Sequence, residues 1–143
     1  VREVMIPRVD VAAIDGTATV DDLLRLLKET GHSRVPLYEE SLDRIQGILY
    51  TKDLLQMLAV GGEFDLTQPL TELIESKRKV DGKTLASFLR EPYYVPETKK
   101  VDELMRDLRA TRTRLAVVVD EYGSTAGLVT TEDLVEEIVG ALR

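Results

Sequence analysis

The chain has 143 residues, enough for one domain or for two small lobes that share a core. It is 43% apolar and 31% charged, which is typical of a globular protein rather than a disordered one. A net charge of −7 without a dense basic block argues against a nucleic-acid partner, and the lack of cysteine excludes disulfides and thiolate metal sites.

The first 60 residues alternate short apolar runs with helical periods. Thr19 and Asp22 form the sequence pattern of a capping box, and apolar residues then recur with the spacing of a half-buried helix until Gly31. The predicted elements are an extended segment near 9–14, a helix between Thr19 and Gly31, strands over 34–38 and 45–50 joined by a hairpin turn over 39–44, and a helix over 51–58.

Residues 60–83 change in character, with glycines, a proline and a basic stretch that mark a connector. We expect a short helix near 70–75 within it and one or two helical turns over 84–90. The predicted elements that follow are an extended piece over 93–96, a helix over 101–108, strands over 114–120 and 126–130 joined by a turn over 121–124, and a helix over 132–140.

The same pattern occurs twice along the chain. Residues 101–108 match 20–27 at an offset of 81, and residues 127–134 match 47–54 at an offset of 80, so one residue is lost between the two matches, most simply in a loop or hairpin. Each copy reads strand–helix–strand–strand–helix and is too small to bury a good core by itself. We therefore expect a mixed α/β (α+β) fold in which two pseudo-symmetric repeats pack sheet to sheet, with both helix starts near a shared cleft.

The candidate ligand-binding residues lie where the last predicted strand leads into the last predicted helix. A helix start carries free N–H groups and suits a phosphate, Thr130 and Thr131 supply hydroxyls, and Asp133 can accept hydrogen bonds from a ribose diol. The alternative is that Thr130 and Asp133 form an ordinary capping box that needs no ligand. Repetition of Thr-x-Asp at Thr51 and Asp53 favours the ligand hypothesis.

Two β-α-β-β-α units that each close with Gly-apolar-apolar-x-Thr-x-Asp resemble a tandem pair of CBS domains, or Bateman module. On this reading residues 1–60 are the first repeat, 61–87 the connector and 88–143 the second repeat. Four further stretches are similar to the CorC/HlyC and CNNM group: Val4–Arg8, Gly31–Pro36, Val119–Gly123 and Gly127–Asp133.

The resemblance implies a regulatory, non-catalytic module that binds ATP, or AMP or ADP, with Mg²⁺ held through the nucleotide phosphates. It implies a position on the cytoplasmic face of a bacterial cell membrane, where the module controls an attached magnesium or cation efflux domain that is absent from this chain. It also implies a homodimer.

Carried over residue by residue, the resemblance places Asp133 at the ribose, and Thr131 and Thr130 at the phosphates. Arg114 is expected at the polyphosphate, with Arg34 as a weaker candidate. The remaining candidates are Tyr94, Val95 and Pro96 beside the base, Tyr50 lining the adenine pocket or shared cleft, and Thr51 with Asp53 as a weaker second site. Because Tyr50 replaces the hydroxyl that Thr130 supplies, we expect one good site per chain.

Two alternatives stay open. The chain is also compatible with a ligand-free dimerisation or interaction module in which Thr130 and Asp133 act only as a cap. The acidic residues at the start of the last helix suit either Mg²⁺ binding or, more simply, a solvated first turn: Glu132, Asp133, Glu136 and Glu137.

Overall fold

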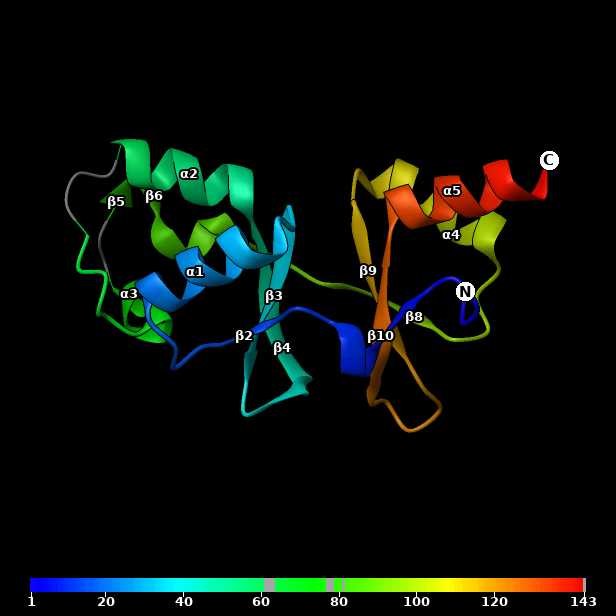
Figure 1. Ribbon diagram of the computed structural model, residues 1–143, viewed down its shortest axis with the longest axis horizontal. Coiled ribbons are helices and arrows are strands. Elements are labelled where there is room, and N and C mark those ends of the chain that lie inside the picture. The colour runs from blue at the N-terminus through cyan, green and yellow to red at the C-terminus, as the bar shows by residue number, and fades with distance from the viewer. Residues whose placement is uncertain (61–63, 77–78, 81, 143) are drawn as a thin grey trace. The chain divides into compact units, whose positions relative to one another are not determined.

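The computed structural model describes residues 1–143 except 61–63, 77, 78, 81 and 143. The described chain forms two compact units, each of which is treated separately below (Figure 1). The central unit is Ala12–Glu91. The terminal unit combines Val1–Val11 with Pro92–Arg143.

The central unit has a four-stranded sheet in the order β2-β3-β4-β7, in which β2 is parallel to β3 and the other pairs are antiparallel. Its strands are β2 (Ile14–Asp15), β3 (Arg34–Glu39), β4 (Ser41–Tyr50) and β7 (Leu89–Arg90), with a separate pair β5 (Lys79–Val80) and β6 (Lys83–Thr84). Its helices are α1 (Val20–Thr30), α2 (Thr51–Val60), α3 (Leu70–Glu75) and the 3₁₀ turn η2 (Leu85–Phe88).

The terminal unit repeats this arrangement with the sheet order β8-β9-β10-β1, in which only β8 and β9 are parallel. Its strands are β8 (Tyr93–Pro96), β9 (Leu115–Val119), β10 (Thr125–Thr130) and β1 (Ile6–Pro7). Its helices are α4 (Val101–Thr111), α5 (Thr131–Ala141) and the 3₁₀ turn η1 (Arg8–Asp10).

The predicted strand–helix–strand–strand–helix repeat is confirmed, and each sheet gains a fourth strand from elsewhere in the chain. β1, from the chain start, pairs with β10 of the second repeat, and β7, which follows the connector, pairs with β4 of the first. In each sheet, the strand that pairs with the added strand has a glycine close to it. A Cβ at Gly127 would meet the carbonyl oxygen of Ile6, and a Cβ at Gly47 would meet the side chain of Leu89. Glycine at this repeat position therefore lets the fourth strand approach.

The one-residue difference between the repeats lies in the β-hairpin, as expected. Gly47 pairs with Leu37 and Gly127 pairs with Val118, so the preceding strands correspond at an offset of 81 and the following strands at 80. Hairpin loops tolerate such changes because they carry few packing contacts.

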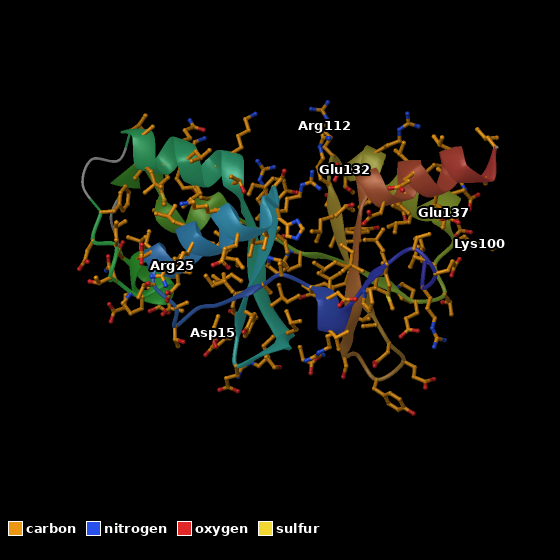
Figure 2. The ribbon with its side chains drawn as sticks, in the orientation of Figure 1. Asp15, Arg25, Lys100, Arg112, Glu132 and Glu137 are labelled. Atoms are coloured by element: carbon orange, nitrogen blue, oxygen red, sulfur yellow. The ribbon has the colours of Figure 1, made fainter. Side chains whose placement is uncertain are left out.

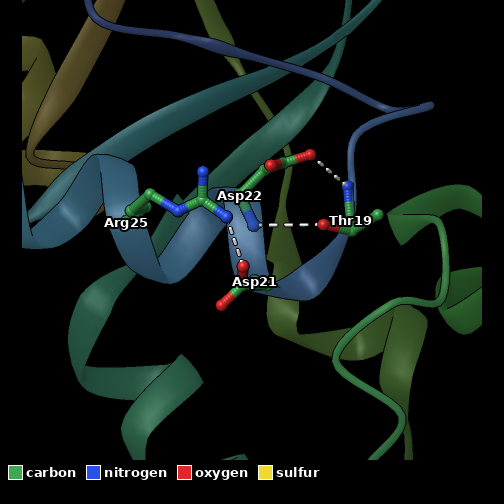
Figure 3. Close-up of polar contacts among 4 residues, drawn as sticks. All are labelled: Thr19, Asp21, Asp22 and Arg25. Carbon is green, nitrogen blue, oxygen red and sulfur yellow. Dashed lines mark hydrogen bonds and ion pairs between the residues drawn. The ribbon is translucent and has the colours of Figure 1, made fainter.

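The two first helices of the repeats start differently. The Thr19 hydroxyl accepts a hydrogen bond from the Asp22 N–H at 3.1 Å, and the Asp22 carboxylate accepts one from the Thr19 N–H at 3.0 Å (Figure 3). Arg25 pairs with Asp21 one turn along the same helix. The predicted capping box of α1 is therefore present, whereas Lys100 at the start of α4 makes no side-chain cap.

Each unit has its own apolar core between its sheet and helices. Leu23 and Leu54 pack with Val35 and Leu37 in the central unit, and Leu104 and Leu134 pack with Val118 in the terminal unit. The helix residues of this set lie on the apolar faces that meet the sheet: Leu23, Leu54, Leu104 and Leu134.

Three predicted segments differ from the structure. The extended segment near 9–14 contains the end of the 3₁₀ turn η1 and only begins β2 at Ile14, because Pro7 is the N-cap of a helical turn that starts at Arg8. The turn over 39–44 is shorter, since β4 begins at Ser41 and Glu40 alone adopts a left-handed φ of 70°. The helical segment over 84–90 is η2 followed by β7.

Candidate functional site

The second Thr-x-Asp motif lies at the start of α5, directly after β10. Thr130 is the N-cap, and its hydroxyl accepts a hydrogen bond from the Asp133 N–H at 3.2 Å. Asp133 Oδ2 accepts one from the Thr130 N–H at 3.4 Å. The capping box is thus formed, and it leaves acceptor capacity on Asp133, because a carboxylate has about four acceptor positions.

Arg114 and Thr131 are joined through the backbone. The Thr131 N–H donates to the Arg114 carbonyl oxygen at 3.0 Å, which ties the first residue of α5 to the residue before β9. The Thr131 hydroxyl donates to the Glu132 carboxylate at 2.9 Å. The structure therefore brings the predicted residues Arg114, Thr130, Thr131 and Asp133 to one end of the terminal sheet.

An open groove of about 1150 Å³ runs between α4 and α5 beside this sheet end. Arg114 and Thr131 line it, and Arg112 and Glu132 project from the same end of the unit (Figure 2). Its floor is apolar, with Met105 and Val135. The groove is lined by arginines and also by the carboxylates of Glu132, Glu136 and Glu137, and Asp133 is not among its lining residues, so it offers room and mixed charge next to the motif.

The predicted base-contacting strand is β8. Val95 is buried in the terminal core, so its side chain is not available to a ligand. Tyr94 is 50% exposed and pairs with Val117 of β9. Val117 is the third residue of β9, and Arg114 directly precedes that strand. Since side chains alternate along a strand, Tyr94 and Pro96 face away from the core that holds Val95.

The first Thr-x-Asp motif begins α2 in the central unit, and its side chains have other hydrogen-bond partners than those of the second motif. The Thr51 hydroxyl donates to the His32 carbonyl oxygen at 2.9 Å, and the Thr51 N–H donates to the Ser33 carbonyl oxygen at 2.8 Å. Asp53 forms a two-point ion pair with Arg90, with Nε to Oδ2 at 3.0 Å and Nη2 to Oδ1 at 3.3 Å.

Tyr50 is flanked by arginines. The guanidinium of Arg90 lies 4.1 Å from the centre of the Tyr50 ring, and that of Arg34 lies 5.9 Å from it. Arg34 is also the direct strand partner of Tyr50. The hydrogen bond with Asp53 raises the pKa of Arg90, and the nearby negative charge adds to this effect.

Sequence reasoning missed Arg90. It belongs to a two-residue strand that pairs with Ile48 and Leu49, and a strand that short has no periodicity to reveal it. The only signal in the sequence was its place shortly before the extended piece over 93–96. The predicted site residues fall into two sets, one in each unit: Arg34, Tyr50, Thr51 and Asp53 in the central unit, and the others in the terminal unit.

Two kinds of feature are missing from the part of the chain that the structure describes. Across the described ranges, no three His, Asp or Glu side chains are grouped so as to hold a metal ion. None of the described helices is both long and apolar enough to cross a membrane.

Comparison with known proteins gives the family. Residues 1–60 and 86–140 match the CBS domain. The magnesium and cobalt efflux protein CorC of Vibrio cholerae is 38% identical over 148 residues, and the alignment covers 100% of this chain and 43% of that protein. The chain therefore spans less than half the length of this relative.

Solved structures agree. The CBS domain of a bacterial CNNM/CorC family Mg²⁺ transporter in complex with ATP is 45% identical, with a TM-score of 0.76 over 97% of this chain and 86% of that one. A CBS-domain pair with bound AMP from Klebsiella pneumoniae is 28% identical, with a TM-score of 0.74 over 98% of each chain. This chain belongs to the CBS domain family, as a CBS pair of the CNNM/CorC group of magnesium transporters.

Proposed function

We propose that this CBS pair is a non-catalytic sensor of adenine nucleotides that controls a magnesium or cation efflux domain. The observation that carries the proposal is the start of α5, where Thr130 and Asp133 cap the helix and the Thr131 N–H donates to the carbonyl of Arg114 at one sheet end. Similar CBS structures that contain ATP and AMP support the same ligand class.

In this proposal Asp133 accepts hydrogen bonds from the ribose hydroxyls. Among the described residues it has no ion-pair partner, so its charge is available to a ligand. Thr130 and Thr131 face the phosphates at the positive end of α5, and the Arg114 guanidinium pairs with the polyphosphate. Mg²⁺ binds with the nucleotide, through phosphate oxygens rather than through a cluster of carboxylates.

The base packs beside β8 in this arrangement. Tyr94 offers an exposed ring and Pro96 follows on the exposed side, while the Val95 side chain is buried. Tyr50 and Arg34 lie together in the central unit, and the contribution of either to nucleotide binding is a separate expectation from the family resemblance.

Control of a transporter requires that nucleotide bind one conformation of the module better than another. We place the module on the cytoplasmic face of the membrane, as a homodimer. The support for dimerisation is an exposed apolar stripe at helical spacing along α5 and its C-cap: Val135, Ile138, Val139 and Leu142. Val135 and Val139 also line the groove between α4 and α5, so a partner subunit would cover that groove.

A second function is a ligand-free dimerisation module. The completed capping box favours it, because Thr130 and Asp133 already satisfy each other without a ligand. On this account Asp133→Ala lowers stability and changes no ligand response.

The test is the melting temperature of the chain with ATP, ADP, AMP and adenosine, each with and without Mg²⁺. We expect ATP with Mg²⁺ to raise it and Asp133→Ala to abolish that rise, because bound ligand stabilises only the folded state. Asp22→Ala is the matched control, since it removes the equivalent cap in α1 and should leave the rise intact. If no nucleotide shifts the melting temperature, the sensor proposal is wrong.

A further inference from the structure

The side chain of Asp53 is already engaged in the structure. Both of its oxygens accept hydrogen bonds from one guanidinium, that of Arg90, at 3.0 and 3.3 Å. With Arg90 in place the Asp53 side chain is 17% exposed, so a ligand that approaches both oxygens together must displace the guanidinium. A ribose diol that donates one hydroxyl to each carboxylate oxygen approaches the same edge of Asp53 as the guanidinium, and it therefore competes with Arg90.

Tyr50 holds Arg90 in this position. The guanidinium lies 4.1 Å from the centre of the ring, a distance typical of a cation–π contact. Arg90 is thus fixed on one side by a charge and on the other by an aromatic face. A planar guanidinium suits this combination in a way that a lysine ammonium does not.

The terminal unit has the aspartate but lacks both the aromatic ring and the arginine of this arrangement. At the position of Tyr50 it has Thr130, whose hydroxyl caps α5 and shares hydrogen bonds with Asp133. Its added strand places Ile6 opposite Leu128, where β7 places Arg90 opposite Ile48. Replacing threonine by tyrosine therefore removes the cap from α2, frees Asp53 from capping and supplies the ring on which Arg90 rests.

The space beside the two motifs differs accordingly. The pocket lined by Asp53, Ser87 and Arg90 has a volume of about 200 Å³, below the range of about 300–1000 Å³ usual for small-molecule sites. The groove at the second motif, which Thr131 lines and Asp133 does not, has about 1150 Å³.

We propose that Arg90 is a specificity-determining residue that keeps the first Thr-x-Asp motif closed to nucleotides by occupying Asp53 itself. The inference rests on the proposed function, since it names the residue that makes the module a one-site rather than a two-site binder. Removing the Arg90 side chain frees both Asp53 oxygens and enlarges the pocket beside them.

The experiment is calorimetric titration of the chain with ATP and Mg²⁺. For the wild type we expect one site per chain. For Arg90→Ala we expect a second site, with affinity raised at least about tenfold over any residual binding at the first motif. That second site should disappear in Arg90→Ala combined with Asp53→Asn. Arg25→Ala is the matched control, because it breaks an exposed Arg–Asp pair elsewhere in the same unit and should leave one site.

A variant that does not fold is recognised by its melting temperature, and Arg90→Lys then replaces it, because lysine keeps the charge but loses the two-point contact. An Arg90 variant that still binds one nucleotide, or binds it more weakly, overturns the proposal. Asp53-dependent binding by Arg90→Ala when the wild type binds nothing supports Arg90 as the closing residue and contradicts the site at Asp133. Absence of binding in both overturns both.

Discussion

The starts of α2 and α5 have the same motif but different surroundings for its aspartate. Asp133 is held by its own helix cap, whereas Asp53 is held by an arginine from β7, far along the chain. The difference follows from two positions outside the motif, Tyr50 against Thr130 and Arg90 against Ile6. In the proposed function, a Thr-x-Asp motif marks where a ribose site can form, and its neighbours decide whether the carboxylate is open.

The largest expected effect concerns the two glycines that lie close to the added strands β1 and β7. Gly127→Ala should lower the free energy of unfolding by about 2 kcal/mol, because its Cβ would meet backbone atoms of Ile6 that cannot move aside. Gly47→Ala should cost less, since the two nearest atoms there belong to the side chain of Leu89 and the backbone oxygen of Arg90 is farther away, at 3.0 Å. Urea denaturation measures both.

Gly140→Ala is the control for this pair. Apart from its chain neighbours and the nearby backbone of its own helix, nothing lies within 4 Å of a Cβ built there, and alanine favours a helix, so this variant should be slightly more stable than the wild type. Equal losses at Gly127 and Gly47 would contradict the proposed difference between backbone and side-chain obstruction.

Arg114 carries the next largest effect. Arg114→Ala should weaken ATP binding about tenfold, the loss of one charge-assisted contact with phosphate. Adenosine binding should change little, because adenosine has no phosphate. Titration calorimetry with both ligands checks this, with Arg109→Ala on the same groove as control. An equal loss for ATP and adenosine would assign Arg114 a structural role instead.

A smaller effect is expected where the first helices of the repeats differ. Lys100→Ser would put a hydroxyl at the N-cap of α4, three residues before Glu103, and so complete the pattern of a capping box in a helix that lacks a side-chain cap. We expect a gain of about 1 kcal/mol in the free energy of unfolding, and a loss of similar size for Thr19→Ala in α1. Thermal and urea unfolding of the two variants would contradict this if both were neutral.

The smallest effect is a pH dependence in the capping box of α1. Hydrogen bonds from Thr19 lower the pKa of Asp22 below its ordinary value of 3.8. The stabilisation is therefore complete above pH 3.8 and is lost as the pH falls through the lower pKa of the folded state. Asp22→Asn mimics the neutral form, so the variant and the wild type should converge in acid. A stability difference that persists unchanged at about pH 2–3 would contradict this.

Much of the fold was predictable from sequence because its signals are local. The Thr19–Asp22 box, the end of α1 at Gly31 and the strand that runs into α5 all follow from short-range hydrogen bonding and apolar period. The pairing of β1 with the second repeat and of β7 with the first was not predictable in this way, because two-residue strands have no pattern and pair only in the folded chain.

The candidate site likewise has a part that local sequence predicts and a part that only the folded chain reveals. Thr130, Thr131 and Asp133 are adjacent in sequence, and the structure places them together as expected, with Arg114 joined to them across the sheet. Polarity alone suggested a longer turn near Arg44, whereas the polar residues there belong to the exposed end of β4. The Arg90–Asp53 pair spans 37 positions, and only tertiary structure reveals it.

The central claim is that the second motif binds nucleotide and the first does not. The most direct measurement is calorimetric titration of ATP with Mg²⁺ into two matched variants, Asp133→Asn and Asp53→Asn. We expect Asp133→Asn to abolish binding and Asp53→Asn to leave both affinity and stoichiometry unchanged. Binding that survives in Asp133→Asn and is lost in Asp53→Asn would contradict the account.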